Sequence, residues 1–144
     1  MNLERLYFLR EENDLTQEDK GKILGVSRVA ISQWETNKEI VPLEKLNIYA
    51  NYFNVSMDYI VGLTNDKTYN IINKELKPNI IGERLLTIRK KLKLTQVKLA
   101  TELNTSHSTI SAYESGKTVI LTTFAYQICL KYNISLDWLC GKTI

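Results

Sequence analysis

One pattern occurs twice in this sequence, and the duplication limits the possible folds more than any other feature does. The stretches SRVAISQWETNK, from Ser27, and SHSTISAYESGK, from Ser106, share the skeleton S-x-x-x-I-S-x-[WY]-E-x-x-K. Matches continue outside them at the same offset of 79 residues, which indicates a duplicated unit of about 65 residues. These matches include Arg5 with Arg84, Leu15-Thr16-Gln17 with Leu94-Thr95-Gln96, and Asn54-x-Ser56-x-Asp58 with Asn133-x-Ser135-x-Asp137.

The repeat predicts two small domains joined by a linker. We place the first domain at residues 1–64, the linker at 65–79 and the second domain at 80–144. The linker, NDKTYNIINKELKPN, is polar and has no counterpart in the repeat, and a short helix around Tyr69 to Leu76 fits within it. Domains of about 60 residues can fold alone, although their cores are small.

The composition is that of a globular protein, with 44% hydrophobic and 24% charged residues. No run of about 18 apolar residues occurs, and the first residues, MNLERLYFLREEND, turn acidic where a secretory signal becomes apolar. We therefore expect a cytoplasmic protein without a membrane segment. Cys129 and Cys140 are predicted to be buried, reduced thiols. No metal site is expected, because the chain has one histidine and no C-x-x-C spacing.

Helical signals cover each repeat, so the predicted fold class is all-α, with two tandem domains of five helices. Apolar residues at every third position from Leu3 predict the first helix. Thr16, with Asp19 three residues later, is expected to start the second helix in a capping box, and Ser27 is expected to cap the third. A fourth helix is expected from about Pro42, which suits a first helical turn. The fifth helices are expected to start at Ser56 and Ser135 and to stop before Gly62 and Gly141.

The connection between the second and third helices is short in both repeats. Its middle residue is Gly25 in the first repeat and Asn104 in the second, and these two residue types tolerate a positive φ best. Gly21 and Ala100, four residues earlier, are small enough to let the two helices approach closely. Together these features specify a helix-turn-helix.

With these motifs, the sequence resembles the lambda-repressor/Cro-like, or Xre-type, helix-turn-helix proteins. The resemblance covers both repeats and rests on the L-T-Q motif, the turn, the I-S-x-[WY]-E core and the closing S-x-D-[YW]-[IL]-x-G. It implies that the outward face of each third helix enters the major groove of double-stranded DNA. The residues expected to contact bases are Arg28, Val29, Ser32 and Gln33 in the first repeat and His107, Ser108, Ser111 and Ala112 in the second.

The chemistry of these two faces differs. Arg28 suits a guanine edge, Gln33 an adenine edge and Val29 a thymine methyl group. The second face carries shorter hydrogen-bonding groups, so we expect it to read DNA less stringently, with His107 contacting either a base or a phosphate. The alternative is that these side chains form only a solvated surface.

The resemblance also implies contacts with the DNA backbone. Gln17 and Gln96 hold the first position of the second helix, where the helix N-terminus favours a phosphate. Lys38 and Lys117 follow the third helix and could reach the backbone beyond it. The resemblance further implies a structural ion pair in each domain, formed by Arg10 with Glu35 and by Arg89 with Glu114.

Charge separates the two halves. Residues 1–64 contain seven Lys and Arg against ten Asp and Glu, a net charge of −3, whereas residues 80–144 contain nine against four, a net of +5. Affinity for DNA of any sequence comes mainly from phosphate neutralisation, so the second domain should supply more of it.

These observations predict a sequence-specific DNA-binding transcription regulator, foremost a repressor, that recognises a non-palindromic site. We expect it in the cytoplasm with the nucleoid, without a cofactor or a small-molecule ligand. The chain stops three residues after Gly141, so switching is expected to come from concentration, a partner or competition. A homodimer stays possible. The alternative is an antitoxin-like or anti-repressor protein whose acidic first domain binds a protein partner. An enzyme is not expected, because no paired carboxylates, activated nucleophile or glycine-rich phosphate loop occurs.

Overall fold

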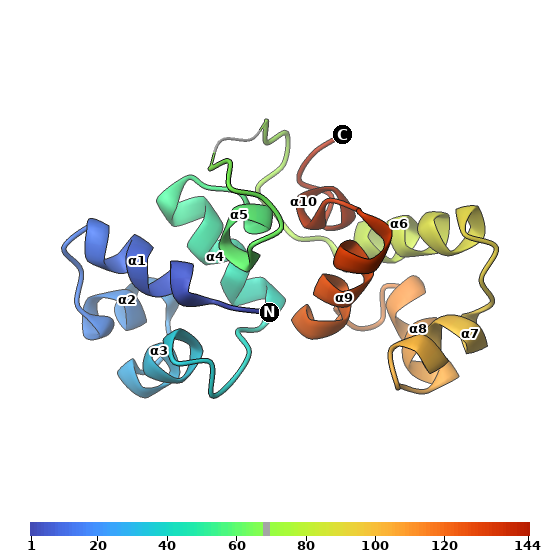
Figure 1. The fold of residues 1–144 in the computed structure, drawn as a ribbon, viewed down its shortest axis with the longest axis horizontal. Helices are drawn as coiled ribbons and strands as arrows, with labels where there is room; N and C mark the ends of the chain where they lie inside the picture. Colours follow the sequence, from blue (N-terminus) through green and yellow to red (C-terminus); the bar gives the residue numbers. More distant parts are fainter. Residues whose placement is uncertain (68–69) are drawn as a thin grey trace. The chain divides into compact units, whose positions relative to one another are not determined.

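The computed structural model describes residues 1–67 and 70–144, and helices are the regular elements of these residues. The chain divides into two compact units, Met1–Tyr69 (unit 1) and Asn70–Ile144 (unit 2), each with five helices (Figure 1). The predicted all-α class with two tandem domains is confirmed. In the described part of the chain, no helix combines the length and the apolar composition that crossing a membrane requires.

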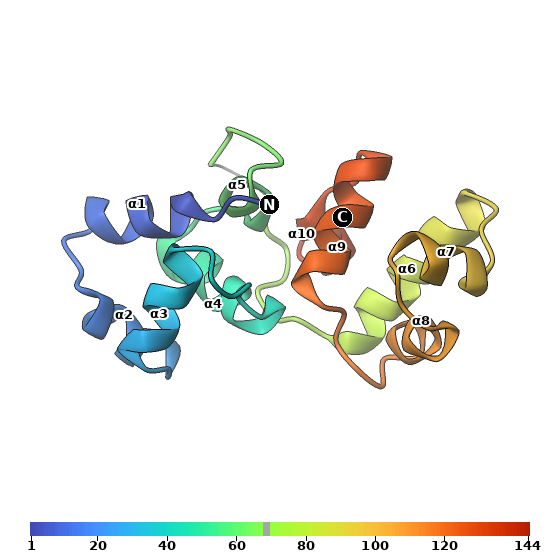
Figure 2. The ribbon, with the colours of Figure 1, turned by 60° about the horizontal axis from the view of Figure 1, so that its bottom comes forward.

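Unit 1 follows the local signals of its sequence closely. Thr16 and Asp19 form the predicted capping box, in which each side chain accepts the other residue's N–H at 3.0 Å. Pro42 lies one residue before its helix instead of in the first turn, because its ψ of 148° is extended. Its helices are α1 (Glu4–Glu12), α2 (Gln17–Leu24), α3 (Arg28–Glu35), α4 (Leu43–Phe53) and α5 (Met57–Val61), with α2 packed against α3 (Figure 2).

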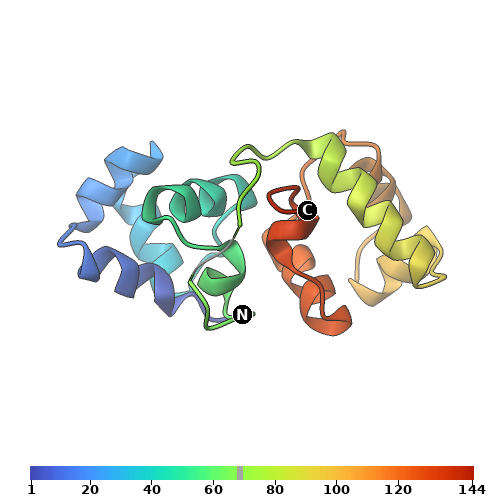
Figure 3. The same ribbon diagram turned by 90° about the horizontal axis from the view of Figure 1, so that it is seen from above.

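Unit 2 repeats this order but has a longer first helix. The helix starts at Pro78 and has 14 residues against nine in α1, and it packs across α8 (Figure 3). Gly82 permits this contact, since a Cβ there would lie 2.5 Å from the carbonyl oxygen of Tyr113. The helices of unit 2 are α6 (Pro78–Lys91), α7 (Gln96–Glu102), α8 (His107–Glu114), α9 (Thr122–Tyr132) and α10 (Leu136–Leu139).

Parts of the segment between the repeats bind to one unit or the other. The N–H of Ser56 donates to the carbonyl of Lys67 at 3.3 Å in unit 1, and the N–H of Ile72 donates to the carbonyl of Lys142 at 2.9 Å in unit 2. The short helix expected around Tyr69 to Leu76 is wrong for residues 70–76, which are not helical, because the N–H groups of Ile72 and Asn73 donate to the carbonyl of Lys142 instead. Tyr69 itself lies outside the described residues.

An arginine of the first helix holds the segment after the last helix in each unit. The guanidinium of Arg5 donates to the carbonyl of Thr64 at 2.6 Å and lies 4.3 Å from the centre of the Tyr59 ring. Arg84 makes the equivalent contacts in unit 2. Its partners there are the carbonyl of Thr143, at 2.8 Å, and the Trp138 ring, at 5.0 Å.

Each unit has its own apolar core, built from matching positions of the repeat. Leu6, Ile31 and Ile60 are fully buried in unit 1, and the residues 79 positions later are fully buried in unit 2. Cys129 and Cys140 are buried, as predicted. The two units therefore share one core plan.

Lys20 is the main exception to this plan. Its side chain is fully buried in unit 1, where unit 2 has the apolar Leu99, and its ammonium has no hydrogen-bond partner among residues 1–67 and 70–144. Aromatic rings surround the ammonium, which offsets part of the cost of burying a charge. Their centres lie 3.4 Å (Phe53), 4.4 Å (Tyr49) and 4.4 Å (Tyr52) from Nζ.

Replacement of Lys20 tests this cost. Burial lowers the pKa of Lys20 from 10.5 to about 7, against an opposing effect of Glu35. The unfolded chain therefore binds more protons between these pH values, so the free energy of unfolding of unit 1 should rise from pH 7 towards pH 10.5 and be flat below. Lys20→Leu should remove this slope and stabilise unit 1 by about 1 to 4 kcal/mol at neutral pH.

Urea unfolding followed by Trp34 fluorescence, in a Trp138→Phe background, measures unit 1 alone. Lys22→Leu is the matched control, because the Lys22 side chain is 75% exposed. If the unfolding free energies of Lys20→Leu and Lys22→Leu were equal and depended equally on pH, the assigned cost of burying the Lys20 ammonium would be contradicted.

Candidate nucleic-acid interface

The turn between the second and third helices has the predicted backbone in both units. Gly25 has a φ of 69° and Asn104 a φ of 56°, both in the left-handed region. A Cβ on Gly21 would lie 2.6 Å from the carbonyl oxygen of Val26, so the turn of unit 1 requires glycine there, whereas unit 2 accommodates Ala100. The prediction of a helix-turn-helix in each repeat is confirmed.

Serine side chains start both third helices. Ser27 Oγ accepts the N–H of Ala30 at 3.2 Å, and Ser106 Oγ accepts the N–H of Thr109 at 3.2 Å. In unit 2 the hydroxyl of Ser108 also lies 3.0 Å from that of Ser106. The hydroxyl of Ser108 therefore belongs to the cap of α8 as well as to its outward face.

The third helices divide into a buried and an outward side, as expected. Ile31 and Trp34 are buried on α3, and Ile110 and Tyr113 are buried on α8. The structure brings each set of expected base-contacting residues together on the opposite side. Arg28, Val29, His107, Ser108 and Ser111 are exposed there, and Ser32, Gln33 and Ala112 are half-buried.

A largely buried ion pair joins the first and third helices of each unit. In unit 1, Arg10 Nε lies 2.8 Å from Glu35 Oε2, and Arg10 Nη2 lies 3.0 Å from Glu35 Oε1. This two-bond geometry is the strongest form of the arginine–carboxylate pair, and it raises the pKa of Arg10. The equivalent distances between Arg89 and Glu114 in unit 2 are 2.7 and 2.9 Å.

Gln17 and Gln96 contact the same ion pairs. Gln17 Nε2 donates to Glu35 Oε1 at 3.3 Å, and Gln96 Nε2 donates to Glu114 Oε1 at 3.0 Å. The glutamate thereby fixes the side chain at the first position of the second helix. The sequence reasoning assigned these glutamines to phosphate alone and missed their bond to the glutamate.

Lys38 and Lys117 lie in matching loops after the third helices. The N–H of Lys38 donates to the carbonyl of Gln33 at 2.9 Å, and that of Lys117 donates to the carbonyl of Ala112 at 3.0 Å. Both side chains are exposed. The loops therefore hold the backbone of both lysines at the same place relative to the third helix of their unit.

The surface around Gln17 is acidic. Gln17 and Arg28 share a shallow depression of about 440 Å³ with three carboxylates, Glu11, Asp14 and Glu18. The equivalent residues of unit 2 are Lys90, Lys93 and Val97. Much of the difference in net charge between the two units thus lies around the first residue of the second helix, where a phosphate contact is expected.

This geometry defines a protein with two helix-turn-helix units, each presenting a capped third helix outward. Residues 6–60 match the family described as helix-turn-helix, and residues 82–142 match a second family described as helix-turn-helix domain. No solved structure matches the chain.

Three similar proteins carry related sequences. The HTH-type transcriptional regulator YobD of Bacillus subtilis is 36% identical over 77 residues, which are 54% of this chain and 69% of YobD. The HTH-type transcriptional activator BcrR of Enterococcus faecalis is 34% identical over 77 residues, 54% of this chain and 37% of BcrR. Antitoxin PezA of Streptococcus pneumoniae is 38% identical over 79 residues, 53% of this chain and 49% of PezA.

The chain belongs to the Xre-type helix-turn-helix family of transcriptional regulators. It is a DNA-binding regulator of transcription with two helix-turn-helix domains in tandem. The matched residues of this chain cover less than two thirds of the length of BcrR and of PezA.

The buried ion pair should stabilise its unit far more than an exposed pair does. Glu114→Gln leaves the guanidinium of Arg89 without its charge partner, so we expect the free energy of unfolding of unit 2 to fall by about 3 kcal/mol or more. Glu102→Gln is the control, because Glu102 pairs at 3.3 Å with Lys131, whose side chain is 58% exposed, and should cost about 1 kcal/mol or less. Urea unfolding followed by Trp138 fluorescence in a Trp34→Phe background measures both. Similar losses would contradict a structural role specific to the buried pair.

Proposed function

We propose that the protein is a repressor that binds an asymmetric site in double-stranded DNA, with α3 and α8 each in a major groove. The observation that carries the proposal is the contrast within each third helix. The buried side, the cap, the turn and the ion pair repeat, whereas the outward residues differ. A fixed scaffold with two different reading faces fits two unlike half-sites in one operator.

The outward side of α3 is the more discriminating of the two. Arg28 is exposed and long enough to bond a guanine edge with two hydrogen bonds, and Val29, 57% exposed, can contact a thymine methyl group. Gln33 is half-buried next to them and suits adenine. On α8, Ser108 already bonds within the cap and Ala112 offers only a methyl group, so His107 and Ser111 carry most of its polar recognition.

Affinity for the DNA backbone should come mainly from unit 2. Gln96 at the start of α7 and Lys117 after α8 are the expected backbone contacts, and Lys90 and Lys93 hold the positions of Glu11 and Asp14 in unit 1. In unit 1, Gln17 and Lys38 occupy the same positions, but carboxylates surround Gln17. Each neutralised phosphate strengthens binding through the release of counterions, so unit 2 provides the larger salt-dependent term.

The same acidic edge supports a second candidate function. Glu11, Asp14 and Glu18 could face a basic protein partner, so that unit 1 binds the partner and unit 2 alone holds DNA. The antitoxin named among the similar proteins is consistent with such a role. In either case the protein acts on the nucleoid in the cytoplasm, as a single chain or as a homodimer.

Selection of sites from a random DNA pool, followed by footprinting, separates these functions. A reader with two unlike faces should enrich one asymmetric site with two protected half-sites, because the outward residues of α3 and α8 differ. Protection of a single half-site would instead favour the protein-binding role of unit 1. No enrichment by the full chain would refute both forms of the proposal.

Substitution of Arg28 tests the assignment of one base contact. Arg28→Ala should cost about 1 to 3 kcal/mol of binding free energy at one base position and relax specificity there. Lys38→Ala is the comparison, because an exposed lysine on the backbone should weaken all sequences equally and reduce the salt dependence by about one ion. Binding titrations on a panel of single-base operator variants measure both. Uniform weakening by Arg28→Ala would show a phosphate contact instead.

A further inference from the structure

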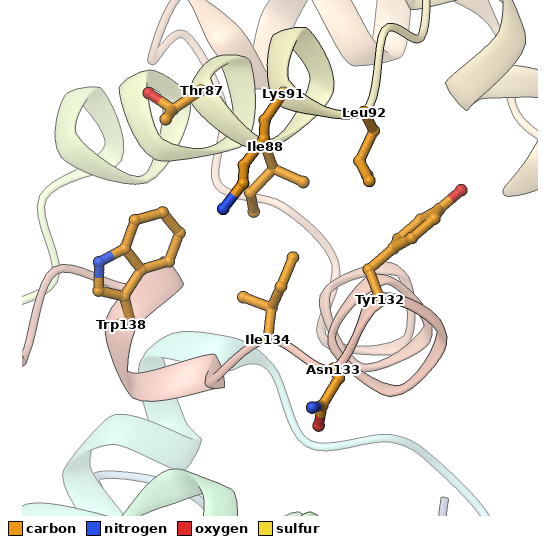
Figure 4. Close-up of a pocket in the computed structure, with 8 residues that line it drawn as sticks. All are labelled: Thr87, Ile88, Lys91, Leu92, Tyr132, Asn133, Ile134 and Trp138. Carbon is orange, nitrogen blue, oxygen red and sulfur yellow. The ribbon is translucent and has the colours of Figure 1, made fainter.

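Two depressions in the surface of unit 2 differ in where they lie relative to α8. One, of about 360 Å³, is lined from α6, α9 and α10, with Trp138 and Tyr132 on opposite sides and Lys91 reaching in from α6 (Figure 4). None of the described residues that line it belongs to α8. The other, of about 550 Å³, is open, and Ser108 and Ala112 of α8 line it. Of the two, the second depression continues the side of α8 that is expected to face DNA.

The loop between α8 and α9 forms the other wall of this second depression. The N–H of Thr118 donates to the carbonyl of Ala112 at 3.4 Å, which ties the loop to the helical turn that it faces. Leu121 lies between Ile120 and Thr122, which are both buried, while its own side chain is 57% exposed. The loop therefore holds an apolar side chain open to solvent at the edge of the depression.

The lining of this depression is suited to an apolar group. Its apolar side chains include those of Ala112, Val119, Leu121 and Phe124. Hydroxyl groups on the α8 side are already engaged, since Ser106 Oγ lies 3.0 Å from Ser108 Oγ and 2.8 Å from Thr109 Oγ1. No Lys, Arg, Asp or Glu of the described residues lines the depression, so it lacks the cations that bind a phosphate.

The matching positions of unit 1 carry different chemistry. At the offset of 79 residues, Ala112 corresponds to Gln33. Phe124 corresponds to Lys45, whose ammonium donates to the carbonyl of Leu24 at 3.0 Å. Unit 1 therefore places an amide and an ammonium where unit 2 places a methyl group and an aromatic ring. The two units differ in the kind of contact that they can make beside the third helix.

We propose that this depression receives the C5-methyl group of a thymine, and that Leu121 is a specificity-determining residue of unit 2. The inference rests on the proposed placement of α8 in a major groove and adds to it a reading residue outside the helix. Thymine fits because its methyl group is the apolar group that base edges present in the major groove. Unit 2 thus reads its half-site partly through an apolar contact, where unit 1 uses the longer polar side chains of α3.

The operator that the full chain selects from a random DNA pool serves as the probe. Each of its thymines is replaced in turn by uracil, which lacks only the methyl group, and binding titrations give the affinity for each duplex. Burial of one methyl group contributes about fourfold in affinity, so at least one of these replacements should weaken binding by about that factor.

Leu121→Ala tests whether that methyl group meets the depression. The same uracil replacement should weaken binding by this variant less than about twofold, because the side chain that contacts the methyl group is gone. Leu130→Ala is the matched control. Leu130 is 60% exposed, against 57% for Leu121, but it lies on α9 and lines neither depression. The control should keep the full loss of about fourfold on replacement by uracil.

An operator in which no replacement by uracil weakens binding would overturn the inference, as would equal losses in the unchanged chain and in Leu121→Ala. In both cases the recovered site would still stand, so the repressor proposal would survive. Failure to recover any site would instead refute the proposed function and this inference together. Both leucines are exposed, so their replacement leaves the core intact.

Discussion

The structure of each unit depends on the buried arginine–glutamate pair. Glu35 binds Arg10 of α1 with both oxygens and also accepts the amide of Gln17, so one carboxylate ties three helices together. A buried charge without its partner costs several kcal/mol. Removal of either the arginine or the glutamate should therefore destabilise the unit strongly. Because the pair fixes where the third helix lies, the outward residues of that helix can change without loss of the fold.

Much of this fold could be predicted because its signals are local. The caps at Thr16 and Ser27 and the positive φ of Gly25 depend on a few consecutive residues, and the repeat supplied a second copy as a check. The start of α6 was missed because Pro78 was assigned to the linker, although proline favours a first helical turn; contact with α8 across Gly82 accompanies the longer helix. Burial of Lys20 also escaped prediction. Three rings of α4 surround it, and only the apolar Leu99 at the matching position was a signal.

The residues predicted to contact DNA lie together on the outward sides of the third helices, but the electrostatics around them could not be predicted without the structure. Net charge predicted that the halves differ. The structure shows that Glu11, Asp14 and Glu18, which lie on either side of the L-T-Q motif in the sequence, line one depression with Gln17. The bond from Gln17 to Glu35 is likewise invisible in sequence, because 18 residues separate the two.

The buried lysine of unit 1 also bears on how long the protein survives in a cell. Each unit has its own core, and the buried Lys20 lowers the stability of unit 1, whereas unit 2 has Leu99 at the matching position. Unit 1 is therefore expected to open more readily than unit 2. Proteases capture chains in their open form, so degradation would begin in unit 1 while unit 2 is still folded. A ligand that binds only folded unit 1, whether DNA or protein, would then lengthen the lifetime of the whole regulator, and occupancy would set its abundance.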